Sequence, residues 1–258
     1  MGNIDSTLAS AGHKALIPYV TMGYPSLEST LETVINLASW GCDIIELGIP
    51  FSDPLADGAT IQKASYQALQ NGVTPKSCIE MAGQIRATID TPLIFMTYYN
   101  LLLHFGLESF CQASAEAGID GLIIPDLPPE EGVELESYSR RYNIDLIYLL
   151  APTSNDERID LVANRSRGFI YLVSLAGVTG ARQALPANLE EFVGRVRKRT
   201  SLPLCVGFGI STPEQAKRVA GIADGVIVGS RLIQLMDGHS SSGLKDFIKG
   251  LRDALDSI

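Results

Sequence analysis

The sequence predicts a single (β/α)8 barrel, the TIM-barrel architecture. Eight short apolar runs that are typical of strands alternate with amphipathic segments that are typical of helices. Each strand–helix unit takes about 25–35 residues, and no segment of the 258-residue chain has the composition of a linker. A doubly wound open sheet is the alternative, but no glycine-rich dinucleotide fingerprint follows the first strand, where that fold would place it. We therefore treat residues 1–258 as one domain.

The predicted strands are short runs that are apolar at nearly every position. This pattern is typical of parallel strands, whose two faces are both covered. A short amphipathic segment, 4–11, precedes the first strand and predicts an N-terminal helix. The expected strands are 15–22, 42–49, 92–99, 121–125, 145–150, 169–175, 203–206 and 225–228.

The helices are predicted from apolar residues at three- and four-residue spacing and from signals at their ends. Ser26 precedes the periodic segment 27–40 and is a favourable N-cap residue. Pro75 opens the segment 75–88, at the position where helices favour proline. A short extra helix, ending at Met236, follows the eighth strand. The other expected helices are 60–70, 107–117, 130–142, 156–164, 189–199, 213–220 and 244–255.

The composition is that of an ordinary globular protein with an acidic surface. Hydrophobic residues make up 46% of the chain and charged residues 19%. The net charge of −9 argues against nucleic acid or an anionic membrane as a partner. No apolar run approaches the roughly 20 residues of a membrane span, and no signal-peptide pattern opens the chain. Four scattered cysteines without CxxC spacing indicate reduced thiols rather than a disulfide framework or a zinc site. We expect a cytoplasmic protein.

The stretch 45–62, IELGIPFSDPLADGATIQ, contains the strongest candidate for a catalytic site. Glu46 interrupts an otherwise apolar strand, and burying an unpaired carboxylate there costs on the order of several kcal/mol. A loop rich in turn residues follows directly and carries Asp53 and Asp57. An acid at the end of a strand beside a polar loop is typical of α/β active sites. The structural alternatives are that Glu46 pairs with a basic residue on a neighbouring strand and that Asp57 only stabilises a turn.

The ends of the last three strands are rich in glycine and predict a phosphate site. Glycine lets backbone N–H groups approach a ligand closely. Ser230 begins the short extra helix, whose N-terminus favours an anion, and such barrels commonly bind phosphate at this place. The alternative is that the glycines only make tight turns. They are Gly177, Gly180, Gly207, Gly209 and Gly229.

The residue types missing from the strand ends narrow the reaction class. No lysine is placed for Schiff-base chemistry, no His or Cys cluster for zinc, and no Ser-His pair for acyl transfer. Carboxylates, tyrosines and a phosphate cradle remain, which indicates acid–base chemistry on a phosphorylated, partly apolar or aromatic substrate. Six residues are expected to line an apolar slot for that substrate, or otherwise to be plain barrel core. They are Tyr19, Met96, Tyr98, Ile123, Leu150 and Tyr171.

Five motifs, in this order along nearly the whole chain, resemble the α subunit of tryptophan synthase. They are IELGIPFSDPLADGATIQ, PDLPPEE, YLVSLAGVTGAR, GFGIS and IVGSRL. The resemblance implies a (β/α)8 lyase of tryptophan biosynthesis that cleaves indole-3-glycerol phosphate to indole and glyceraldehyde 3-phosphate. It implies no cofactor and no metal in this chain. It also implies a partner, a β subunit that carries pyridoxal phosphate and receives the indole.

The same resemblance implies a role for particular residues. Glu46 corresponds to the acid–base glutamate, and Asp57 to the aspartate that stabilises positive charge on the ring nitrogen. Thr179 corresponds to the threonine of a mobile loop that meets the aspartate on closure. Breaking the carbon–carbon bond leaves electrons on indole C3, so protonation of C3 has to come first. The phosphate-binding backbone corresponds to Gly180, Phe208, Gly209, Gly229 and Ser230.

Three positions depart from the residues usual in this family, namely Tyr24, Ala59 and Leu175. They lead us to expect looser loops and altered coupling to the partner. The acidic loop 51–58 is rich in proline and has few apolar anchors, so we expect it to be poorly ordered when the chain is alone. A phosphosugar isomerase on the same barrel is a competing interpretation, but it would need a second acid–base group at the end of the first strand. A second competing interpretation is a subunit that only activates its partner. The presence of both proposed catalytic acids, Glu46 and Asp57, argues against it. Whether indole is channelled or released stays open.

Overall fold

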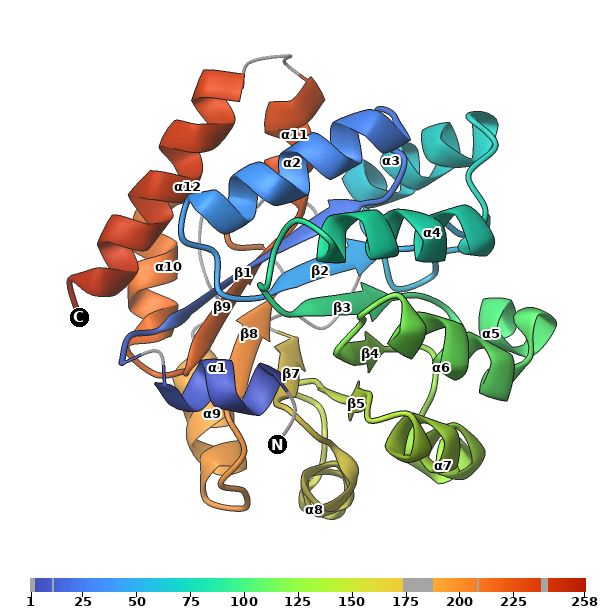
Figure 1. Cartoon of the computed structure of the whole chain (residues 1–258). Coiled ribbons are helices and arrows are strands. Elements are labelled where there is room, and N and C mark those ends of the chain that lie inside the picture. The colour runs from blue at the N-terminus through green and yellow to red at the C-terminus, as the bar shows by residue number, and fades with distance from the viewer. Residues whose placement is uncertain (1–2, 11, 174–187, 208, 238–240) are drawn as a thin grey trace.

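The computed structural model confirms the predicted barrel and describes residues 3–10, 12–173, 188–207, 209–237 and 241–258. All pairings between its strands are parallel, in the order β5-β4-β3-β2-β1-β9-β8-β7-β6. Figure 1 shows the strands at the centre with helices packed around them. The strands are β1 (Ala15–Thr21), β2 (Ile45–Gly48), β3 (Leu93–Met96), β4 (Gly121–Ile123), β5 (Asp145–Ile147), β6 (Leu149–Leu150), β7 (Ile170–Val173), β8 (Leu204–Gly207) and β9 (Gly225–Val228).

The fifth predicted strand is divided in two at Tyr148. β5 pairs with β4, whereas β6 pairs with β7, so the sheet begins and ends on consecutive pieces of one segment and the barrel closes. Between the pieces, the Tyr148 N–H donates to Ser166 Oγ at 3.1 Å, and the Tyr148 carbonyl accepts from the Tyr171 N–H at 3.1 Å. The division therefore leaves no unpaired backbone group at Tyr148.

The helices largely follow the predicted segments. The Ser26 side chain accepts a hydrogen bond from the Ser29 N–H, and Pro75 opens a helix that Thr74 caps. The extra helix after the last strand is present as α11. The helices are α1 (Asn3–Ser10), α2 (Leu27–Ser39), α3 (Ala59–Gln70), α4 (Pro75–Arg86), α5 (Tyr99–Phe105), α6 (Leu107–Glu116), η1 (Pro129–Glu131), α7 (Val133–Arg141), α8 (Asp156–Arg165), α9 (Leu189–Arg197), α10 (Pro213–Ala220), α11 (Ser230–Asp237) and α12 (Ser241–Asp256).

Two helical segments differ from the prediction, and long-range contacts explain both. α5 stands where the third strand was expected to end, because the Tyr99 N–H in its first turn donates to Asp126 Oδ1 at 2.9 Å from the next loop. The helix expected over 130–142 is broken at Gly132 into η1 and α7. A side chain at Gly132 would overlap the hydroxyl of Tyr148, so the break accommodates a strand residue.

The apolar core forms two layers, one inside the barrel and one between the strands and the helices. The inner layer includes Ile17, Ile94 and Ile147, and Ile4 of α1 packs with it, fully buried. The barrel interior is thus filled, and the C-terminal ends of the strands remain as the place for chemistry. None of the described helices combines the length and the hydropathy that crossing a membrane requires.

Candidate active site

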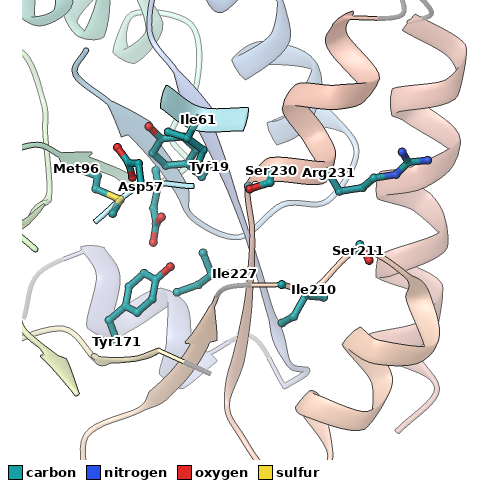
Figure 2. Close-up of a pocket in the computed structure, with 13 residues that line it drawn as sticks. Tyr19, Asp57, Ile61, Met96, Tyr171, Ile210, Ser211, Ile227, Ser230 and Arg231 are labelled. Atoms are coloured by element: carbon teal, nitrogen blue, oxygen red, sulfur yellow. The ribbon is translucent and has the colours of Figure 1, made fainter. Parts of the chain in front are cut away.

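A pocket opens at the C-terminal ends of the strands, where the sequence predicted it. Figure 2 shows Tyr19, Asp57 and Met96 together at one end, and Ile210, Ser211 and Ser230 toward the other. Its walls come from β1, β2, β3, β7 and β9, from the loops after β2, β8 and β9, and from the first turns of α3 and α11. The lining residues are Tyr19, Glu46, Asp57, Ile61, Met96, Tyr171, Gly209, Ile210, Ser211, Ile227, Gly229, Ser230 and Arg231.

Glu46 lies on β2 between Tyr19 of β1 and Ile94 of β3, and its side chain faces the pocket. It is fully buried, and neither carboxyl oxygen has a hydrogen-bond partner among the described residues. Burial raises the pKa of this carboxyl group to about 8, so it is mostly protonated at neutral pH. The structural alternative, an ion pair with a neighbouring strand, finds no partner in the described part of the chain.

Asp57 lies in the loop between β2 and α3 and is 5% exposed. Its N–H donates to the Pro54 carbonyl at 3.0 Å, and its carbonyl accepts from Gln62 Nε2 at 2.9 Å. The N-cap of α3 is Gly58, so the Asp57 carboxylate is not used to cap that helix. Burial raises its pKa to about 6, and a hydrogen bond from Tyr98 opposes that rise.

The two acids thus occupy one pocket with pKa values on either side of neutral. Near pH 7 Glu46 holds a proton and Asp57 has mostly lost its own. A pair of acids separated in this way can supply a proton donor and a negative charge at the same time. The structure therefore brings the two predicted catalytic residues together in complementary ionisation states.

The opposite end of the pocket contains Gly209, Gly229 and Ser230, as the sequence predicted for a phosphate site. Gly209 has a φ of 84°, a conformation that favours glycine. Phe208, Gly180 and Thr179 lie outside the described residues. Five further lining residues were not predicted, although each belongs to a motif singled out in the sequence, GFGIS, IVGSRL or the stretch 45–62. They are Ile61, Ile210, Ser211, Ile227 and Arg231.

Only some of the six residues expected to form an apolar slot line the pocket. Tyr19, Met96 and Tyr171 line the pocket, whereas Ile123 packs below it in the inner core layer and Tyr98 contacts the loop that carries Asp57. Leu150 was wrongly placed, since it belongs to the outer core layer. Its neighbour Leu149 pairs with inward-facing Tyr171, and alternation along the strand turns Leu150 to the other face.

Comparisons with known proteins show relatives along nearly the whole chain. The family model described as tryptophan synthase alpha chain matches residues 6–251. The tryptophan synthase alpha chain of Dehalococcoides mccartyi is 58% identical over 244 residues, covering 94% of this chain and 96% of the relative. That of Chloroflexus aggregans is 50% identical over 266 residues and covers 100% of both.

The chain belongs to the tryptophan synthase alpha chain family. The crystal structure of tryptophan synthase subunit alpha from Legionella pneumophila superposes with a TM-score of 0.92 at 37% identity, covering 100% of both chains. The protein is a lyase of tryptophan biosynthesis that cleaves indole-3-glycerol phosphate to indole and glyceraldehyde 3-phosphate. The family uses no cofactor in this chain, and pyridoxal phosphate is carried by its partner, the β subunit.

Proposed function

We propose that Glu46 is the general acid and base of indole-3-glycerol phosphate cleavage and that Asp57 stabilises the positive charge on the indole ring. The observation that carries this proposal is the pair of buried carboxyl groups in one pocket, one mostly protonated and one mostly ionised near pH 7. The protonated group can donate, and the ionised group can stabilise a cation in a site that excludes water.

The chemistry begins with transfer of the Glu46 proton to indole C3. The ring becomes an iminium-like cation, and ionised Asp57 accepts a hydrogen bond from the ring N–H and stabilises that charge. The carbon–carbon bond then breaks, and its electron pair returns to the indole ring. The hydroxyl group on the departing carbon loses its proton and becomes the aldehyde of glyceraldehyde 3-phosphate. Glu46, now a carboxylate, takes this proton and returns to its starting state.

The two ends of the pocket suit the two ends of the substrate. We place the indole ring beside Tyr19, Met96 and Tyr171 and the phosphate at the N-terminus of α11, where free backbone N–H groups favour an anion. Thr179 is proposed to meet Asp57 when the loop that carries it closes over the substrate. The proposed phosphate contacts are Gly180, Phe208, Gly209, Gly229 and Ser230.

The test of the catalytic role is a Glu46→Gln variant, with Glu80→Gln on the surface of α4 as a matched control. We expect the rate of cleavage to fall by roughly 10²–10⁴-fold, the usual contribution of a general acid–base group. Binding of a glycerol phosphate analogue should persist, because Glu46 lies at the other end of the pocket from the phosphate. Near-wild-type turnover of Glu46→Gln would refute the role.

We also propose that the enzyme works in the cytoplasm. All four cysteines, Cys42, Cys78, Cys111 and Cys205, are buried with free thiols, a state typical of a reducing compartment. Fractionation of cells that express the chain would test this, and recovery outside the cytoplasm would contradict it.

A further inference from the structure

Tyr98 lies just beyond the end of β3, against the loop that carries Asp57. Its side chain is 5% exposed, and its ring stacks on Phe51 with the centroids 5.1 Å apart and an interplanar angle of 29°. It does not line the pocket in which Glu46 and Asp57 lie. Any effect of this tyrosine on the reaction is therefore expected to come from its contacts with the loop and not from contact with the substrate.

The Tyr98 hydroxyl contacts two consecutive residues of that loop. Its oxygen accepts a hydrogen bond from the Ala56 N–H at 3.1 Å. Its own proton is then available for the Asp57 carboxylate, and a hydrogen bond between the two side chains lowers the pKa of Asp57. An O–H donor to a carboxylate favours the ionised form, which is the form that the charge-stabilising role requires.

The loop is held at its other points by α3. The Phe51 N–H donates to Ser65 Oγ at 3.0 Å, and Gln62 Nε2 donates to the Asp57 carbonyl at 2.9 Å. These bonds fix the backbone of the loop at Phe51 and at Asp57, whereas Tyr98 is the one of these anchors whose hydroxyl group also lowers the pKa of the Asp57 carboxyl group. The loop has few apolar anchors, and the structure supplies hydrogen bonds in their place, two from α3, which follows the loop directly, and one from the more distant Tyr98.

We propose that Tyr98 is a positioning residue that holds the loop 51–58 so that the Asp57 carboxylate faces the indole nitrogen. The proposal rests on the function proposed above for Asp57. The other titratable groups around Asp57 are the phenols of Tyr19 on β1 and Tyr171 on β7, whose pKa values the Asp57 charge helps to raise, and Glu46 of β2, which lines the same pocket.

Removing the hydroxyl tests this role without removing the ring. Tyr98→Phe keeps the stack on Phe51 but leaves Asp57 without this donor, so the pKa of Asp57 rises above its value of about 6. Activity needs Asp57 ionised and Glu46 protonated. The acid limb of the kcat/KM profile should therefore move to higher pH, and kcat at pH 7 should fall about ten-fold, the usual effect of losing a hydrogen bond to a charged group.

A double-mutant cycle of Tyr98→Phe and Asp57→Asn distinguishes the positioning role of Tyr98 from the function proposed for Asp57. It is measured on the chain alone and with saturating β subunit. If Tyr98 acts through Asp57, Tyr98→Phe should change kcat less than two-fold in the Asp57→Asn background. The neighbouring Tyr99→Phe is the matched control and should leave the pH profile in place.

An equal loss in both backgrounds, or an unmoved acid limb, would overturn the positioning role. Wild-type turnover of Asp57→Asn would instead refute the proposed function of Asp57. Should Tyr98→Phe fail to fold, 3,5-difluorotyrosine at position 98 provides a second test. This stronger donor should move the acid limb to lower pH, and an unchanged limb would refute the proposal.

Discussion

Glu46→Gln should make the protein more stable at neutral pH while it lowers the rate of cleavage by roughly 10²–10⁴-fold. In the folded chain Glu46 is fully buried with a pKa of about 8, against an ordinary value of 4.5. At pH 7 the unfolded chain therefore carries an ionised Glu46, while the folded chain has to keep it protonated. Folding then includes the uptake of a proton, which opposes it increasingly as the pH rises.

The size of this effect follows from the pKa difference. Each pH unit above 4.5 costs about 1.4 kcal/mol up to the folded pKa, so the penalty at pH 7 is about 3 kcal/mol. Glutamine has nearly the same shape and does not titrate, so Glu46→Gln removes this penalty. Its amide is buried without partners much as the protonated acid is, and that cost of about 1–3 kcal/mol largely cancels between the two chains.

The assay is urea unfolding of the wild type and of Glu46→Gln between pH 5 and pH 8. Near pH 5 the two free energies of unfolding should nearly coincide, and the variant should gain steadily as the pH rises. Other buried acids, such as Asp145 with a pKa raised to about 6, titrate in the same way in both proteins. They therefore do not contribute to the difference between the two free energies of unfolding. A difference that does not change with pH, or a variant less stable at pH 7, would refute the reasoning.

Three further outcomes are expected. Asp57→Asn should lower kcat more than it weakens substrate binding, since its charge matters mainly in the transition state; a rise in KM alone in steady-state assays would contradict this. Gly229→Val should weaken glycerol phosphate analogues but not indole in binding titrations, because a side chain there would block the approach of a phosphate to the backbone N–H groups; the Cβ itself fits, at 3.4 Å from Tyr19. Gly194→Val, on the exposed face of α9, is its control. Titrating β subunit into the chain should raise kcat ten-fold or more by favouring the closed state, about 1.4 kcal/mol of coupling. Full activity of the chain alone, unchanged by β subunit, would instead indicate release of free indole.

Much of the site could be predicted because its signals are local. A single acid in an apolar strand marks Glu46, and a proline- and glycine-rich loop beside it marks Asp57. Glycines after the last strands mark Gly209 and Gly229. Apolar runs and helical spacing predicted the alternation of strands and helices, since both patterns follow from the backbone geometry of a few neighbouring residues.

What depends on contacts between distant segments came only from the tertiary structure. Alternation says that Leu149 and Leu150 face opposite ways but not which one faces inward, and the pairing of Leu149 with Tyr171 decides it. α5 begins at Tyr99, where the third strand was expected to end, because Asp126, 27 residues further along the chain, bonds its first turn. The raised pKa of Glu46 likewise depends on its burial in the folded barrel, and the anchoring of the Asp57 loop depends on its hydrogen bond to the distant Tyr98. Neither can be predicted from neighbouring residues in the sequence.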